Sequence, residues 1–229
     1  MVGNIPEAES LVRSLVETGK SLGRKVSAVI TEMNQPLGRM VGNILEVREA
    51  IDCLKGKGPA DVMEVVITLT AYMLIMGGLC NELKEAQKLC YKHIVDGSAL
   101  NKFMQNVDFQ GGNSELLLNN QKILQAKAII PLKSWEDGYI ISVDAFKVGL
   151  AIVLVGAGRA TKEEHVRSCV GVELIKTKGD SVDKGEVLLK LHTEDIKASQ
   201  EALEILKSAY IFSKEKVSLE SRIIKEIKE

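Results

Sequence analysis

Three groups of residues in this sequence have types and spacings that could do chemistry. Glu46 and Glu49 lie three positions apart, and paired carboxylates can hold a metal ion or act as acid and base. The run Gly156-Ala157-Gly158-Arg159 places an arginine beside two glycines, an arrangement that can bind phosphate through backbone N–H groups. Histidine is the usual general base near neutral pH, and the sequence has three, at positions His93, His165 and His192.

Each group also has a simpler interpretation. The glycine run lacks the third glycine of a dinucleotide fingerprint and the Gly-Lys-Ser/Thr of a P-loop. A helix end followed by a capping box, Thr161-x-x-Glu164, explains it better. The histidines are expected in charged or strand-edge surroundings. None has a Ser, Cys or Asp at a spacing that indicates a nucleophile–base pair. The two glutamates fit a solvated helix face, so the patterns alone assign no catalytic residue.

Composition excludes several classes of protein. Of the 229 residues, 27% are charged and 4% are aromatic, with a formal net charge of −1. Without excess positive charge or many aromatic rings, nucleic-acid and membrane-surface partners are not expected. The uncharged run 65–80 is shorter than the roughly 20 residues that cross a bilayer, so it predicts a buried helix. No signal peptide is recognised, and a cytoplasmic location is expected.

The four cysteines show no C-x-x-C pair and no clustered histidines. Free thiols are therefore expected at all of them, in place of a zinc site or disulfides. They are Cys53, Cys80, Cys90 and Cys169.

The elements that position these residues form a helix-rich portion followed by a mixed portion. Apolar spacing predicts helices over 5–23, 43–54, from about 61, 81–95 and 98–107, with a short strand at 25–31. Strands are expected at 128–131, 138–143, 170–177 and 186–192, and a helix at 195–210. The charge-rich segment 213–229 is expected to be a surface helix or frayed.

These elements predict an α/β fold class. Residues 1–130 would be the helix-rich portion of a mixed-sheet α/β domain. Residues 131–229 would form an α+β C-terminal domain with a sandwich-like hairpin around residues 179–185.

Four motifs, in order along the chain, resemble the thymidine and pyrimidine-nucleoside phosphorylases. Residues 34–51, NQPLGRMVGNILEVREAI, form the longest and most specific one. The others are Leu54-Lys55-Gly56-x-Gly58-Pro59-x-Asp61, the run from Gly156 to Glu163, and Val182-x-Lys184-Gly185-Glu186. The resemblance extends from the helix that contains Glu7 to about Tyr210.

The resemblance implies a pentosyltransferase of pyrimidine metabolism and nucleoside salvage. Such an enzyme cleaves thymidine or uridine with inorganic phosphate as co-substrate, giving free base and pentose 1-phosphate, and uses no organic cofactor. The family is homodimeric. This chain resembles roughly its C-terminal half, without the upstream phosphate- and base-binding segments. We therefore expect the chain to be inactive alone, and to form a homo-oligomer or to associate with an N-terminal half.

The resemblance carries over one set of site residues. The family binds potassium or another monovalent cation through two backbone carbonyls and one carboxylate, which match Leu37, Met40 and Glu49. Oxygen ligands suit a hard cation, and Glu49 supplies the only charge. Substrate-binding residues are not assigned.

Two alternatives belong to other functional classes. The chain could be a non-catalytic structural or dimerisation fragment. It could also be a carrier module, because the hairpin around residues 179–185 resembles that of biotinyl and lipoyl domains, with Lys147 as the modified residue near a turn. A carrier would gain mass on Lys147, whereas a phosphorylase would release free pyrimidine.

Overall fold

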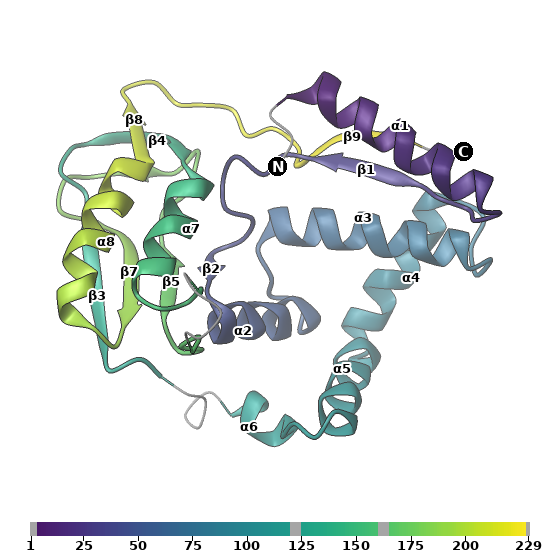
Figure 1. Cartoon of the computed structure of the whole chain (residues 1–229), viewed down its shortest axis with the longest axis horizontal. Helices are drawn as coiled ribbons and strands as arrows, with labels where there is room; N and C mark the ends of the chain where they lie inside the picture. Colours follow the sequence, from purple (N-terminus) through teal and green to yellow (C-terminus); the bar gives the residue numbers. More distant parts are fainter. Residues whose placement is uncertain (1–3, 120–124, 160–164, 228–229) are drawn as a thin grey trace.

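The N-terminal portion is mainly helical in the computed structural model, which describes residues 4–119, 125–159 and 165–227 (Figure 1). Helix α1 (Ile5–Ser21) begins where the Asn4 side chain accepts the backbone N–H of Glu7 at 2.9 Å, as an N-cap does. Strand β1 (Ala28–Thr31) follows. The further helices are α2 (Asn43–Leu54), α3 (Ala60–Met76), α4 (Leu83–Val95), α5 (Ser98–Phe109) and α6 (Ser114–Leu118).

Helix α3 corresponds to the uncharged run of the sequence. It packs against α4 through a small apolar cluster that includes Ile67, Ala71 and Ala86, together with the buried thiols Cys80 and Cys90. Among the described residues, no helix has the length and apolar character needed to cross a membrane. The helix prediction is confirmed for this run, but its burial is confirmed for one face only, since Val66, Leu69 and Met73 are 44–71% exposed.

The C-terminal portion alternates strands and helices. Its elements are β3 (Ala128–Lys133), β4 (Gly138–Val143), α7 (Ala145–Leu154), β5 (Gly171–Leu174), β6 (Ser181–Val182), β7 (Val187–Thr193), α8 (Ile196–Ala209) and β8 (Tyr210–Ser213). The larger sheet also includes the short strand β2 (Met40–Val41) and has the order β2-β5-β7-β3. The smaller sheet has the order β6-β4-β8. Every strand pair of the described residues is antiparallel, including the predicted hairpin pair β5–β7.

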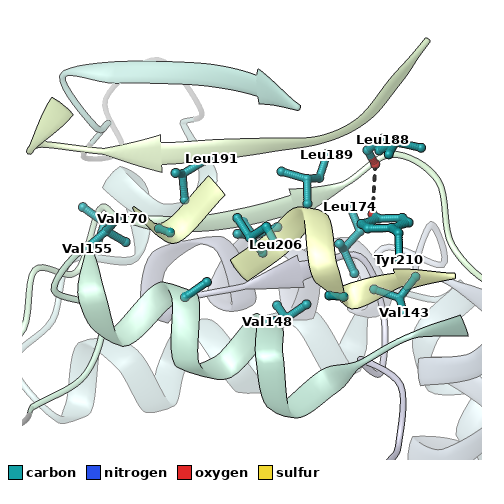
Figure 2. Packing of buried hydrophobic residues seen from close by; sticks show 14 of the residues in the cluster. Val143, Val148, Val155, Val170, Leu174, Leu188, Leu189, Leu191, Leu206 and Tyr210 are labelled. Carbon is teal, nitrogen blue, oxygen red and sulfur yellow. Dashed lines mark hydrogen bonds between the residues drawn. The ribbon is translucent and has the colours of Figure 1, made fainter. Parts of the chain in front are cut away.

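The main core lies between the larger sheet and the helices α7 and α8 (Figure 2). Leu189 and Leu191 of β7 and Leu206 of α8 are completely buried in it. The hydroxyl group of the buried Tyr210 donates to two backbone carbonyls, that of Lys176 at 3.1 Å and that of Leu188 at 3.3 Å. Burial of these apolar side chains fixes α7 and α8 on one face of the sheet.

Two short strands connect the portions of the chain. Strand β2 (Met40–Val41) pairs with β5, and thereby extends the C-terminal sheet. Strand β9 (Ile223–Ile227) returns to pair with β1, where Ala28 lies opposite Ile227. Figure 1 shows this β1–β9 ribbon between α1 and α3.

The prediction of a helix or a frayed end over 213–229 is wrong for the described residues. Strand β8 ends at Ser213 and β9 occupies residues 223–227. The isoleucines of β9 favour a strand once β1 offers a partner. That partner lies almost 200 residues earlier, so nothing in the local charge pattern indicates it.

The α/β fold class is confirmed, with helices and sheets mixed through the chain. Helix α2 has the bounds that the sequence predicts, whereas the short elements β2 and α6 were not predicted. The division at residue 130 stays a prediction. Strands β2 and β9 both pair across that division.

Candidate functional site

The loop of residues 34–42 includes β2 and lies beside α2 and α3. It contains the first half of the longest of the four motifs, and α2 contains the rest. Its end is fixed by Gly42, which has φ +128° and lies so close to Val170 and Gly171 that a Cβ atom would overlap them. The backbone N–H of Gly42 donates to Glu46 at 3.0 Å. Glu46 therefore accepts a hydrogen bond at the N-terminus of its own helix.

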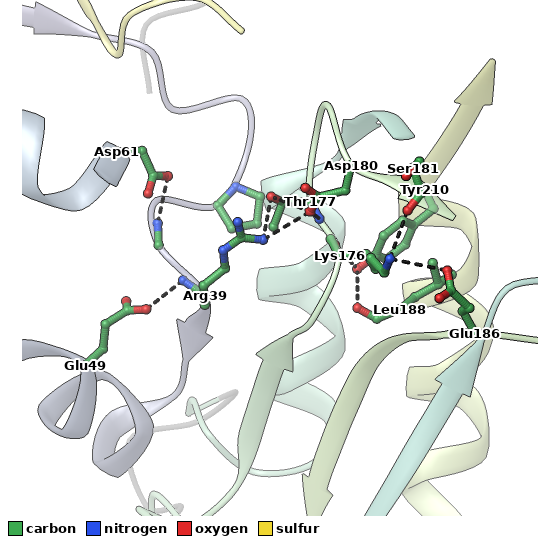
Figure 3. Close-up of polar contacts among 12 residues, drawn as sticks. Arg39, Glu49, Asp61, Lys176, Thr177, Asp180, Ser181, Glu186, Leu188 and Tyr210 are labelled. Atoms are coloured by element: carbon green, nitrogen blue, oxygen red, sulfur yellow. Dashed lines mark hydrogen bonds and ion pairs between the residues drawn. The ribbon is translucent and has the colours of Figure 1, made fainter. Parts of the chain in front are cut away.

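Glu49 lies one turn further along α2 and binds the loop itself (Figure 3). Its carboxylate accepts the backbone N–H of Arg39 at 2.7 Å. Asp61, at the start of α3, accepts the neighbouring N–H of Gly38 at 3.1 Å. Two carboxylates from two helices thus hold consecutive amides of one loop.

Gly38 makes this approach sterically feasible. It has φ +80°, and an added Cβ would overlap the Glu49 carboxylate and the Val62 side chain. A residue with a side chain could not keep this backbone and leave Glu49 in place.

The pKa of the Glu49 carboxyl group is raised by its surroundings. Burial raises its pKa, and the negative charges of Asp61 and Glu46 raise it further, against the backbone N–H groups of Arg39 and Met40. None of the ion pairs found among the described residues includes Glu49. The solvated-face interpretation is therefore wrong for Glu49, which is half-buried, and holds for Glu46, which is exposed.

The three predicted cation ligands lie at the wall of one cavity of about 570 Å³. Leu37 and Met40 come from the loop, and Glu49 comes from α2. The rest of the wall is mainly apolar and includes Ala50, Cys53, Leu54, Val62, Val66, Phe103 and Val148. Backbone carbonyls beside one half-buried carboxylate fit a hard monovalent cation.

Two observations limit other chemistry at this cavity. Burial, with the nearby charges of Glu49 and Asp52, raises the pKa of Cys53 to about 11, so this thiol is not a thiolate nucleophile at neutral pH. Within the described ranges, no three His, Cys, Asp or Glu residues are grouped so as to hold a metal ion. Glu46 also lines the cavity, so its available oxygen donors are backbone carbonyls and the carboxylates of Glu49 and Glu46.

Two arginines on the other side of the loop were not singled out from the sequence. Arg39 donates to Thr177 Oγ1 at 2.6 Å and lies 3.4 Å from Asp180 Oδ2, which joins the loop to the turn before β6. Arg222 reaches the loop from the segment before β9, where its guanidinium donates to the Pro36 carbonyl at 2.9 Å. Both line a more polar cavity of about 390 Å³.

The three histidines lie on different elements and form no common site. His192 is buried in β7, a central strand, and its Nε2 lies 3.7 Å from Glu173 Oε2. The prediction of charged surroundings is therefore confirmed for it, and the strand-edge alternative does not apply. Burial lowers its pKa despite Glu173 nearby. His165 lies in the loop before β5, close to Arg167 and Asp195.

His93 has a serine neighbour that the sequence analysis did not identify. Its Nδ1 lies 2.6 Å from Ser98 Oγ, which also donates to Asp96 at 2.6 Å. In a Ser-His-Asp triad the aspartate binds the histidine and orients it. Here Asp96 accepts hydrogen bonds from the hydroxyl and the backbone N–H of Ser98, the first residue of α5, and lies 4.0 Å from His93 Nδ1, the same nitrogen that faces the serine.

The remaining candidates occupy structural positions where they are described. Gly156 has φ +97° and its carbonyl accepts the Arg167 N–H at 2.8 Å, whereas the capping box from Thr161 to Glu164 lies outside the described residues. Lys147 is in the first turn of α7 and donates to the Ser208 carbonyl at 2.8 Å. It does not lie at a hairpin tip between strands, where a carrier lysine would be expected.

Comparison with known proteins agrees with the geometry of both portions. A model of the "Glycosyl transferase family, a/b domain" matches residues 2–100, and a model of the "Pyrimidine nucleoside phosphorylase C-terminal domain" matches residues 139–213. The chain is 42% identical over 190 residues to a pyrimidine-nucleoside phosphorylase of Geobacillus stearothermophilus. It is 40% identical over 189 residues to one of Staphylococcus aureus strain USA300.

The chain belongs to the pyrimidine-nucleoside phosphorylase family. The two matches cover 83% and 82% of this chain but 44% of each relative. The chain therefore spans less than half the length of the phosphorylases it matches. The loop, α2 and the start of α3 all lie within the residues matched to the a/b domain.

Proposed function

We propose that this chain contributes to pyrimidine-nucleoside phosphorolysis, in which phosphate displaces the base and pentose 1-phosphate forms. The observation that carries the proposal is the identity of 40–42% to pyrimidine-nucleoside phosphorylases over more than four fifths of the chain. Thymidine and uridine are the substrates we expect, and the working assembly is a homodimer.

The reaction needs no covalent nucleophile from the protein. Positive groups position phosphate, while other groups stabilise the pyrimidine anion as it leaves, so catalysis depends on positioning and electrostatics. We infer that those groups belong to the part of the full-length enzymes that this chain does not match, since the match covers 44% of the relative's length. We expect this chain to be inactive alone and to supply the scaffold against which they are placed.

We further propose that the loop and α2 hold a potassium or other monovalent cation. The Leu37 and Met40 carbonyls and the Glu49 carboxylate would be ligands, together with groups from the rest of the enzyme. The support is the half-buried carboxylate of Glu49, which takes part in none of the ion pairs found among the described residues. It lies beside a cavity that Leu37 and Met40 also line. When bound, the cation neutralises this carboxylate and stabilises the loop. Glu49, in turn, keeps the amide of Arg39 in place.

Complementation tests the proposed reaction. The purified 229-residue chain is incubated with uridine or thymidine and phosphate, alone and with the N-terminal part of the Geobacillus relative that precedes the matched region. Release of free base is followed by absorbance, with sulfate in place of phosphate as control. We expect phosphate-dependent release from the mixture and none from either polypeptide alone.

Two outcomes would contradict the proposal. Phosphate-dependent release by the chain alone would show that it holds a complete site, and would overturn the expected inactivity. A complex that forms in the mixture but releases no base would count against phosphorolysis and favour the structural or dimerisation alternative. A mass increment on Lys147 in cells would instead support a carrier.

A further inference from the structure

The segment after β8 returns across the molecule and reaches the candidate cation loop. Figure 1 shows it running from the C-terminal sheet to β9, beside β1. Just before β9, Arg222 makes a set of contacts with residues more than 160 positions away. Its side chain is 15% exposed, so these contacts are largely shielded from water.

The guanidinium of Arg222 binds three acceptors around the loop. One nitrogen donates to the Pro36 carbonyl at 2.9 Å and to Asp61 Oδ2 at 3.2 Å. The other nitrogen donates to the Glu32 carboxylate. A planar guanidinium presents several donors in fixed directions, a geometry that one ammonium group cannot reproduce.

These contacts bracket Leu37 on both sides. Arg222 binds the carbonyl of the preceding residue, Pro36. The same Asp61 oxygen that Arg222 binds also accepts the N–H of the following residue, Gly38, at 3.1 Å. The peptide groups before and after Leu37 are therefore tied, directly or through Asp61, to one side chain.

The backbone of Arg222 is itself anchored. Its N–H donates to Glu64 Oε2 at 3.0 Å, and the Ser221 hydroxyl donates to Glu64 Oε1 at 2.6 Å. Glu64 lies in α3, one turn after Asp61. The guanidinium is thus held against the helix that also carries its partner Asp61.

We propose that Arg222 is a positioning residue for the cation loop, and that it fixes the direction of the Leu37 carbonyl. This rests on the proposed function, in which that carbonyl is a cation ligand. Pairing of β9 with β1 is then coupled to cation affinity, because β9 carries Arg222 to the loop. Arg222 is not among the residues that line the cavity of the proposed cation ligands.

Hydrogen–deuterium exchange on the whole 229-residue chain tests this role. Exchange of a peptide spanning residues 36–42 is measured across a potassium chloride titration, with tetramethylammonium chloride keeping ionic strength constant. In Arg222→Ala we expect about tenfold faster exchange of this peptide without potassium, because its local opening becomes easier. We expect the half-saturating potassium concentration to rise about fivefold, because the ligand carbonyl is no longer preorganised.

Lys225→Ala is the matched control. Lys225 lies three residues later, in β9, but it pairs with Glu9 of α1 at 2.7 Å and not with the loop. It should leave both the exchange of residues 36–42 and the potassium response unchanged. Exchange of β7 reports whether each variant stays folded. If exchange of β7 shows that Arg222→Ala unfolds the chain, Arg222→Lys is used instead. We expect Arg222→Lys to accelerate exchange less, and only in the loop.

The outcomes separate this role from the cation site. Unchanged loop exchange in folded Arg222→Ala, or in Arg222→Lys where the alanine variant unfolds, overturns the positioning role. An equal effect of Lys225→Ala does so too. Glu49→Gln should abolish the potassium response. If potassium fails to protect the wild-type loop even when the N-terminal part of the Geobacillus relative is added, the cation site is overturned. The exchange without potassium still tests whether Arg222 fixes the loop.

Discussion

At the scale of single residues, the candidate site depends on one close approach, that of Gly38 to Glu49. Gly38→Ala forces a side chain into a left-handed backbone conformation and against the Glu49 carboxylate and Val62. Gly23→Ala is the control, since Gly23 has φ +69° but open space around it. We expect a cost of about 1–2 kcal/mol at Gly23 from backbone strain alone. At Gly38 we expect roughly 1–3 kcal/mol more.

Urea unfolding of the two variants measures this difference. Equal losses of unfolding free energy at Gly38 and Gly23 would show that Glu49 yields without cost, and that the carboxylate does not need its present position. A larger loss at Gly38 would support a rigid link between the loop and α2.

The sequence identifies some of these residues and not others, for physical reasons. Glu49 is found because it lies in a long motif that resembles a known family. Its half-burial depends on packing of the loop against α2 and α3, which periodicity does not describe. Arg222 gives no local signal, because its partners Glu32, Pro36 and Asp61 are distant in sequence and become neighbours only on folding.

At the scale of elements, side-chain orientation in the larger sheet decides what a substitution costs. Leu191 of β7 is completely buried, whereas Ile129 of the adjacent strand β3 is 50% exposed. We expect Leu191→Ala to lower the unfolding free energy by roughly 2–5 kcal/mol, because it leaves a cavity in the core. Ile129→Ala should cost less than about 1 kcal/mol.

Denaturant unfolding with a global probe compares this pair directly. A small effect of Leu191→Ala would mean that the sheet is not packed against α7 and α8 as described. A large effect of Ile129→Ala would mean that the outer face of β3 is covered in solution.

Elements with strong local signals were predicted well, and those that depend on distant partners were not. Helix α2 has apolar residues at helical spacing between glycines, so its limits follow from the chain itself. Strands β2 and β9 are short, and each exists by pairing with a strand far away in sequence. The charges around β9 favoured a surface helix until β1 supplied its hydrogen-bond partner.

At the scale of the whole molecule, the two portions are connected through the same loop. The loop gives β2 to the C-terminal sheet, receives Arg222 from the segment before β9, and binds carboxylates of α2 and α3. A change in how the portions pack would therefore alter the Leu37 and Met40 carbonyls.

The surface of α3 makes a prediction about association. Val66, Leu69, Met73 and Met76 recur at helical spacing on one face of the helix and are 39–71% exposed. Exposed apolar stripes of this kind favour association. We expect the chain to self-associate through this stripe, with an apparent mass in sedimentation equilibrium that rises with concentration.

The double variant Leu69→Lys/Met73→Glu should weaken the association about tenfold or more, because burying those charges is unfavourable. Phe109→Glu, at an exposed position on α5 outside the stripe, is the control and should leave it unchanged. A folded chain that sediments as a monomer throughout would show that the α3 stripe is not an interface between copies, and the N-terminal part of a phosphorylase would then be the partner to test against it.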